Sequence, residues 1–247
     1  MNANYTINQN QLTFLDQRFY QAGEDVYVPS VTTILNAYPK DAGYYEWLKK
    51  VGEDADTIRD EAGRRGSVVH NLTEQYDNGE EVCLINERGT IDYKLGEWAM
   101  FERYVDFRTR FPAEIFHNEF NLINEELGFA GTLDRVMNID GKTLLVDIKT
   151  SNAIYPSYWL QLAAYEQLLI KYHGYNTLDG VAILWLNAKT RTEGKKGAIQ
   201  GAGWQLVVKE DTDKDWELFQ ATHKLWLAEN EGIKPKQLTY QIKHKLQ

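Results

Sequence analysis

The sequence predicts an α/β (α+β) fold with a mixed central β-sheet flanked by helices. Helical patterns come first, three strand patterns follow, and a further helix and two more strands come after them, which is the order of a layered α and β domain. Leu, Val and Ile at period two mark the strands, and apolar residues at helical spacing mark the helices. With 247 residues and 43% hydrophobic content, the chain can bury one good core, so we expect one domain with an N-terminal extension.

Residues 1–52 are predicted to form that extension. Residues 12–21 and 26–28 are expected to pair as a hairpin around a Gly-containing turn. Ser30 can then cap a helix over residues 31–37, because a serine oxygen accepts a hydrogen bond from the free amides of a first helical turn.

A second helix is predicted over residues 41–51, with Asp41 as its N-cap and Gly52 as its end. Three aromatic residues supply its apolar bulk. Such residues are usually core, but in a protein that binds unpaired bases they would form a stacking platform. They are Tyr44, Tyr45 and Trp47.

The main body, residues 53–233, begins with a helical pattern that Gly63 and Gly66 interrupt. His70 follows Gly66 by one turn, and the small glycine would allow a close backbone approach there. A histidine on a helix is more often packed or exposed than a metal ligand, so His70 by itself decides nothing. Residues 92–111 form a further amphipathic helix whose role looks structural.

A strand is predicted over residues 114–123, alternating between Phe116, Phe120 and Leu122 on one side and polar residues on the other. Glu119 falls on the polar side. It is either a support for a neighbouring site or an ordinary exposed glutamate.

Two further strands, residues 129–139 and 143–149, are joined by Asp-Gly, which is a strong hairpin signal. Asp134 and Asp147 are then expected to face each other across this hairpin. Lys149 shares a face with Asp147, because side chains two apart on a strand point the same way.

Two carboxylates close together near a core are costly unless a cation compensates them. Mg²⁺ or Mn²⁺ would do so, since hard oxygen ligands suit these ions, and Lys149 would orient a water or neutralise charge on a phosphate. The alternative is a simple surface ion pair, because Asp-x-Lys is common in hairpins.

The next helix is predicted over residues 157–172, introduced by Pro156. Gln161 and Tyr165 lie one turn apart on it. Tyr165 is either a core aromatic or, with Gln161, a polar contact to substrate or to Lys149. A second strand pair, residues 181–187 and 203–209, is joined by a loop rich in Gly and Lys, and residues 215–230 form the last helix.

The ordered elements Gly131-x-x-Asp134, Asp147-x-Lys149 and Gln161-x-x-x-Tyr165, preceded by His70 on a helix, resemble the PD-(D/E)XK nucleases and, more narrowly, their RecB-like exonuclease branch. Pro-Ser-Val-Thr-Thr-Ile-Leu around Ser30 is similar to a segment of phage and mitochondrial genome maintenance exonucleases. Gly-Thr-Leu-Asp in place of Pro-Asp, and Asp147 in place of the commoner Glu, are departures that the RecB-like branch tolerates.

The resemblance implies an α-β-β-β-α-β nuclease core and a metal-dependent deoxyribonuclease, an exonuclease on single-stranded DNA with a free end, acting in DNA repair, recombination or phage DNA metabolism. The implied catalytic residues are Asp134, Asp147, Lys149, Gln161 and Tyr165. The implied ligands of Mg²⁺ or Mn²⁺ are His70, Asp134, Asp147 and the Ile148 carbonyl, with Glu119 as support. A structure- or site-specific endonuclease and an inactive module that binds DNA ends remain the alternatives.

The formal net charge of −9 disfavours broad contact with duplex DNA. Residues 187–209 nevertheless carry a net +4, and so does the basic tail, residues 234–247, so local contact with one strand is expected. A solvated surface is the commoner reading of such runs. The candidate nucleic-acid contacts are Arg64, Arg65, Ser30, Lys195 and Lys196.

Cys83 is the single cysteine, which excludes an intrachain disulfide and a four-cysteine iron-sulfur cluster. The polar N-terminal residues have neither the apolar core of a signal peptide nor the Arg-rich character of a transit peptide. We therefore expect a bacterial or phage-infected host cytoplasm as the compartment and no membrane as a partner.

Overall fold

The computed structural model describes residues 11–15, 17–173, 178–187, 190–192, 195–200, 203–233 and 235. The predicted basic tail therefore lies outside the described residues, apart from position 235. No helix in the described part is both long and apolar enough to cross a membrane.

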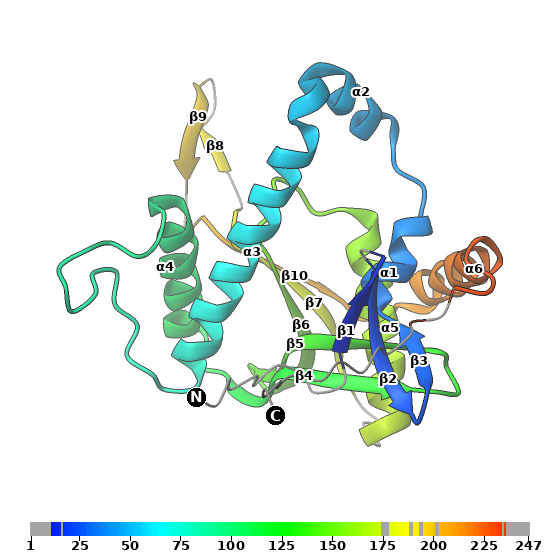
Figure 1. The fold of residues 1–247 in the computed structure, drawn as a ribbon. Coiled ribbons are helices and arrows are strands. Elements are labelled where there is room, and N and C mark those ends of the chain that lie inside the picture. The colour runs from blue at the N-terminus through cyan, green and yellow to red at the C-terminus, as the bar shows by residue number, and fades with distance from the viewer. Residues whose placement is uncertain are drawn as a thin grey trace, which may run out of the picture.

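A mixed five-stranded sheet forms the centre of the molecule and confirms the predicted fold class (Figure 1). Its strands are β4 (Glu114–Asn124), β5 (Phe129–Ile139), β6 (Lys142–Lys149), β7 (Gly180–Trp185) and β10 (Gln205–Lys209). Their order across the sheet is β10-β7-β6-β5-β4. Strands β6 and β7 are parallel, whereas the other neighbours are antiparallel.

The hairpin between β5 and β6 turns at the predicted Asp-Gly pair. Asp140 and Gly141 have φ angles of 51° and 81°, so both central residues are left-handed, as a type I′ turn requires. The ladder of paired residues runs from this turn to Arg135 and Val146. The far end of the hairpin is where the acidic residues lie.

Helices cover both faces of the sheet (Figure 1). They are α1 (Val31–Ile34), α3 (Ala55–Asp77), α4 (Leu95–Arg110), α5 (Pro156–His173) and α6 (Asp213–Glu229). Helices α1, α5 and α6 pack with Leu133 and Leu145 in one core cluster, and α3 and α4 pack with Val146 and Leu184 in the other. The run α4-β4-β5-β6-α5-β7 has the predicted α-β-β-β-α-β order.

Helix α3 is continuous where an interruption was predicted at two glycines. A Cβ atom at Gly63 would meet no atom within 4 Å, and one at Gly66 would lie 3.5 Å from the Thr150 hydroxyl oxygen, an ordinary contact. Neither glycine is therefore required for a close approach. The helix accepts each of them at a cost of about 1 kcal/mol relative to alanine.

The N-terminal segment is a three-stranded antiparallel sheet of β1 (Gln11–Phe14), β2 (Gln17–Gly23) and β3 (Val26–Pro29). The predicted single strand over residues 12–21 is wrong, because the chain turns at Leu15, whose φ is 49°. Phe19 is buried in the same cluster as the residues of the central sheet. The segment that was predicted as an extension thus shares the main core.

Helix α2 (Ala42–Val51) has the predicted caps. The Asp41 side chain accepts a hydrogen bond of 2.8 Å from the Tyr44 amide, and Gly52 ends the helix with φ of 58°. No residue of α2 is buried, however, so its aromatic residues are not core. The helix lies beside the N-terminal end of α3 and away from the central sheet (Figure 1).

Residues 189–201, predicted as a loop, contain a two-stranded antiparallel hairpin in their described part. Its strands are β8 (Thr190–Thr192) and β9 (Lys195–Gln200). It is not part of the central sheet.

Candidate active site

The predicted acidic pair lies where the β5–β6 ladder ends. One step beyond the last pair in this register places Asp134 opposite Asp147. Here the Asp134 carboxylate replaces a backbone partner, because its Oδ2 accepts a hydrogen bond of 2.6 Å from the Ile148 amide. Both aspartates are buried, with 8% and 2% of their surface exposed. Two buried carboxylates therefore share one end of the hairpin.

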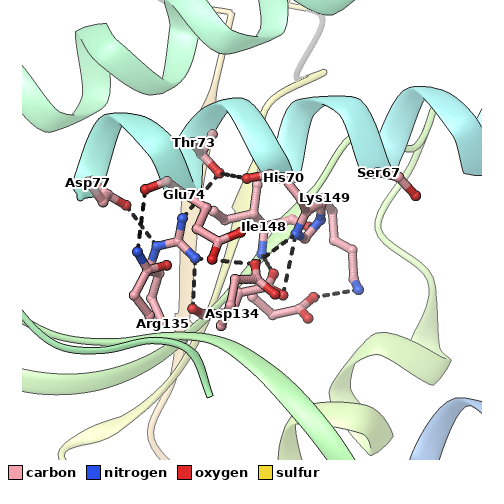
Figure 2. Close-up of polar contacts among 12 residues, drawn as sticks. Ser67, His70, Thr73, Glu74, Asp77, Asp134, Arg135, Ile148 and Lys149 are labelled. Carbon is pink, nitrogen blue, oxygen red and sulfur yellow. Dashed lines mark hydrogen bonds and ion pairs between the residues drawn. The ribbon is translucent and has the colours of Figure 1, made fainter. Parts of the chain in front are cut away.

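His70 approaches these carboxylates from α3 (Figure 2). Its Nε2 lies 3.0 Å from the Ile148 carbonyl oxygen, which can only accept, so Nε2 carries a proton in this arrangement. Its Nδ1 lies 3.4 Å from Asp134 Oδ1 and 3.6 Å from Glu119 Oε1. Both ring nitrogens of His70 thus face oxygen atoms of other elements.

Glu119 reaches the site from β4 through an unusual backbone conformation. Its φ is 45°, and the ladder between β4 and β5 pairs the residues on either side, Asn118 and Phe120, but not Glu119 itself. A non-glycine residue in the left-handed region is strained, and such strain often marks functional positions. The Glu119 side chain is 24% exposed, so this glutamate is not an ordinary surface residue.

The predicted alternation of this strand is wrong at Phe116, which is 40% exposed. The register of the β4–β5 ladder shifts between Ile115 and His117, and a residue inserted in this way is turned away from the pleat. Nothing in the residue types at these positions signals that shift.

Asp147 and Lys149 form an ion pair, with 2.6 Å between Oδ2 and Nζ. Gln161 of α5 joins both: its amide nitrogen donates to Asp147 Oδ1 at 3.3 Å, and its carbonyl oxygen accepts from Lys149 Nζ at 3.1 Å. Lys149 also lies 4.6 Å from the centre of the Tyr158 ring. Val146 and Ile148 point into the core on the opposite face, as strand alternation requires.

Tyr165 connects two of the sequence motifs. Its hydroxyl lies 3.3 Å from the Gln161 amide nitrogen, and its ring packs against Gly131. A Cβ atom at position 131 would lie 2.3 Å from a ring carbon of Tyr165, so only glycine fits there. Tyr165 is therefore both a core aromatic, 4% exposed, and a partner of Gln161.

Sequence reasoning missed Arg135, which is fully buried next to Asp134. Its Nη1 donates to Glu119 Oε1 at 3.3 Å and to the Asp134 carbonyl at 2.8 Å, and its Nε donates to Asp77 Oδ2 at 2.7 Å. An arginine inside a mostly apolar, buried strand is itself a signal, because a buried charge needs partners.

The donor atoms of His70, Glu119 and Asp134 all lie within 4.8 Å of one another, so these residues could hold a metal ion. His70 Nδ1, which lies 3.4 Å from Asp134 Oδ1 and 3.6 Å from Glu119 Oε1, is the nitrogen placed to serve as the ligand; adjacent ligands of octahedral Mg²⁺ at about 2.1 Å are about 3 Å apart. A set of oxygens with one imidazole fits Mg²⁺ or Mn²⁺. The predicted ligands included Asp147, with Glu119 only as a support. In the structure Glu119 belongs to the group of three, and Asp147 is paired with Lys149.

The electrostatics of the cluster follow from burial and from opposed charges. Burial alone would raise the pKa of Asp134, but attraction to His70 lowers that pKa to about 2. Burial, with repulsion from Asp134, raises the pKa of Asp147 to about 6, although Lys149 opposes the rise. Burial would lower the pKa of His70, but Asp134 and Glu119 raise it to about 10.

The pKa of Lys149 is also raised, because Asp147 and Asp134 outweigh the effect of burial. Lys149 is therefore a cation beside the acidic pair. In this arrangement it is suited to stabilise negative charge and to orient a water, and it is not suited to act as a base.

The residues predicted to contact nucleic acid differ in burial and in their partners. The Ser30 hydroxyl is buried and caps α1 by accepting from the Thr33 amide at 3.0 Å, and its contact with DNA stays a prediction. Arg64 pairs with Glu61 and with the buried Glu97. Arg65 is half-buried and forms no ion pair with another described residue. Lys195 and Lys196 are on β9, and their side chains lie outside what the structure describes.

Comparison with known proteins gives structural neighbours only. No family model matches the sequence, and no curated protein matches it. Among solved structures, the chain is similar to an alkaline exonuclease (LHK-Exo) from Laribacter hongkongensis, with 11% identity, coverage of 82% of this chain and 87% of that chain, and a TM-score of 0.40. LHK-Exo in complex with dAMP gives 13% identity, 83% and 88% coverage, and the same TM-score of 0.40. The function proposed below therefore rests on the geometry of the site.

Proposed function

We propose that this chain is a metal-dependent DNA exonuclease of the RecB-like PD-(D/E)XK type. The observation that carries the proposal is the meeting of two groups at one end of a hairpin. One group, His70, Glu119 and Asp134, is suited to hold a divalent cation. The other, the buried Asp147 with the half-buried Lys149, places a cation beside that group. A metal and a fixed positive charge side by side can stabilise the negative charge that develops when a phosphodiester is hydrolysed.

The residues proposed to hold Mg²⁺ or Mn²⁺ are His70, Asp134, Asp147 and the Ile148 carbonyl, with Glu119 supporting the ion or its water. When bound, such an ion acts as a Lewis acid on the phosphate oxygens and makes bound water more acidic. The orientation of Asp134 and His70 is set in advance by their contacts with the Ile148 backbone. These contacts limit the rearrangement that binding requires.

Lys149 is proposed to stabilise the charge that grows on the phosphoryl oxygens while a water oxygen attacks phosphorus and the P–O ester bond breaks. Gln161 holds the Lys149 ammonium and the Asp147 carboxylate in one arrangement. Tyr165 holds Gln161 and is itself fixed by packing on Gly131. Gln161 and Tyr165 are thus proposed to act by positioning Lys149.

The proposed substrate is single-stranded DNA with a free end. The aromatic residues of α2 support this, since unpaired bases stack on such rings; Tyr45 is exposed, and Tyr44 and Trp47 are half-buried. The net charge of −9 disfavours wide contact with a duplex. Arg65, Lys195 and Lys196 are proposed phosphate contacts. Such an enzyme would serve DNA repair, recombination or phage DNA processing in a bacterial or phage-infected host cytoplasm.

The test compares an end-labelled linear single strand with a closed circle of the same sequence and with a duplex, in Mg²⁺, Mn²⁺ or EDTA. We expect the linear strand to be shortened progressively from an end, only with metal, while the circle persists. Asp134→Asn is the matched inactive control, because it keeps the shape of the side chain but removes the charge.

Rapid cutting of the circle, without delay relative to the linear strand, would show an endonuclease. Retention of DNA without cleavage in any metal would show a DNA-binding module. Cleavage that persists in EDTA would contradict the role of a metal.

A further inference from the structure

Arg135 contacts two residues of the candidate metal group, Glu119 and Asp134, and is linked to the third, His70, through Thr73. It touches the Glu119 carboxylate and the Asp134 backbone carbonyl directly. Its Nη2 also donates to Thr73 Oγ1 at 3.2 Å, and that hydroxyl donates to the His70 carbonyl at 2.8 Å (Figure 2). A single guanidinium therefore links β4, β5 and α3 at the site.

The cost of burying Arg135 argues that this linkage has a purpose. The residue is fully buried on the face of the sheet that also contains Met137 and Val146, where an apolar residue would be expected. Replacing a buried ion pair with apolar residues of similar volume is often neutral or stabilising, so the pair is weak evidence of a role in stability alone. The planar arginine guanidinium has five N–H donors, so it can instead hold several acceptor groups at defined angles.

Asp77 holds the guanidinium from the opposite side. Its Oδ2 accepts from Arg135 Nε at 2.7 Å and also from the Tyr104 hydroxyl of α4, and its Oδ1 lies 3.3 Å from Arg108 Nε. The Asp77 side chain is 1% exposed. Arg135 thus has a rigid anchor on the side away from the site, and Arg108 shares this anchor without contacting the metal group.

We propose that Arg135 is a positioning residue that assembles His70, Glu119 and Asp134 into a metal-binding arrangement. This inference rests on the proposed metal site but does not require nuclease activity. In this proposal the Arg135 guanidinium fixes the orientation of the Glu119 side chain. The strained backbone of Glu119 persists only if surrounding contacts hold it in place. Because Thr73 bonds both to Arg135 and to the His70 carbonyl, the same guanidinium also sets the distance between strand β5 and the turn of α3 that contains His70.

The experiment measures Mn²⁺ affinity of the full chain by calorimetry, after the fold of each variant has been checked by circular dichroism. Arg135→Lys keeps the positive charge, but one ammonium cannot reach Asp77, Glu119 and the Asp134 carbonyl together. We expect its Kd for Mn²⁺ to rise at least ~10-fold, the usual effect of losing a partner behind a ligand. DNA cleavage should recover most of its kcat at saturating Mn²⁺, with KM for DNA unchanged.

Arg108→Lys is the matched control, because it disturbs the same Asp77 without touching the metal group. Its Kd for Mn²⁺ should stay within about twofold of wild type, because a residue behind the metal site changes metal affinity only if it contacts a ligand. Wild-type affinity in Arg135→Lys, or an equal loss in both variants, would overturn the positioning role.

Thr73→Val tests the same chain of contacts if Arg135→Lys does not fold. It keeps the side-chain shape and removes only the hydroxyl between Arg135 and His70. We expect weaker Mn²⁺ binding in Thr73→Val and recovery in Thr73→Ser, and wild-type affinity in Thr73→Val would refute the link. Wild-type protein that binds Mn²⁺ but cleaves no DNA would refute only the nuclease, whereas wild-type protein that binds no Mn²⁺ would refute the positioning role.

Discussion

Helix α3 has two unlike halves, and they differ in where their charged side chains find partners. In the N-terminal half the partners lie on exposed surface, except the buried Glu97 of α4, which also pairs with Arg64. Arg59 pairs with Asp56, and Arg64 pairs with Glu61, each three residues apart along the helix. All four side chains are more than 40% exposed.

In the C-terminal half the partners come from other elements and are buried. His70 faces Asp134 of β5 and Glu119 of β4, and Asp77 pairs with Arg135. The side chains of Asp77 and Arg135 are 1% and 0% exposed. Exposed pairs contribute about 0–1 kcal/mol, whereas breaking a buried pair costs about 3–5 kcal/mol.

The same helix therefore carries solvent-exposed ion pairs at one end and buried charged contacts of the candidate site at the other. Strand β6 repeats the contrast, because Lys142 pairs with Glu210 at the surface while Lys149 pairs with the buried Asp147. Residue type does not separate these cases. Burial and the element that supplies the partner separate them, and substitutions in the exposed and buried pairs test this difference.

The largest expected effect is the loss of cleavage in Asp134→Ala and in Asp147→Ala, because each removes a carboxylate proposed to hold the metal. Both variants should fold and retain DNA, and calorimetry should show weaker Mn²⁺ binding. Asp56→Ala, in the exposed half of α3, should cleave like wild type. Unchanged Mn²⁺ binding in both of the first two variants would show that the ligand assignment is wrong.

Lys149→Ala should lower the turnover number by at least ~10²-fold, as expected when one preorganised charge is removed from a transition state. Lys142→Ala is the control on the same strand and should leave turnover unchanged, because its ion pair is exposed. Single-turnover rates measure both. Near-wild-type rates in Lys149→Ala would remove Lys149 from the mechanism and reduce its pairing with Asp147 to a structural contact.

The arm formed by α2 and the exposed half of α3 should matter for binding and not for folding. Tyr45→Ala and Trp47→Ala should weaken binding of single-stranded DNA by about 1–3 kcal/mol per lost stack, with thermal stability unchanged because no residue of α2 is buried. Fluorescence anisotropy with a labelled strand measures the change. If stability falls and affinity does not, these rings have a packing role that their exposure does not indicate.

The smallest effects concern two glycines, one in the exposed half of α3 and one on β5 beside the candidate site. Gly131→Ala should lower the free energy of unfolding by about 1–3 kcal/mol, because the new Cβ would overlap the Tyr165 ring. Gly63→Ala should raise it by about 0.5–1 kcal/mol, because position 63 is open and helical. Urea unfolding compares them, and a shift in the same direction for both would contradict the packing described at Gly131.

The sequence by itself determined the elements whose causes are local. Asp140 and Gly141 specify a type I′ turn, and Asp41 and Gly52 specify the ends of α2. Because the side-chain period of a strand is two, the same local information put Asp147 and Lys149 on one face. The fold class followed from the order of these elements.

Only the tertiary structure decided which charged residues from distant parts of the chain meet. Glu119 enters the site with a left-handed backbone, at a position that the β4–β5 ladder leaves unpaired, and Arg135 is buried because Asp77, 58 residues earlier, compensates it. The burial of Ser30 as a helix cap and the pairing of Arg64 with Glu97 were likewise set by tertiary packing. Contacts between residues far apart in sequence depend on how helices pack on the sheet, and neither periodicity nor residue type encodes that packing.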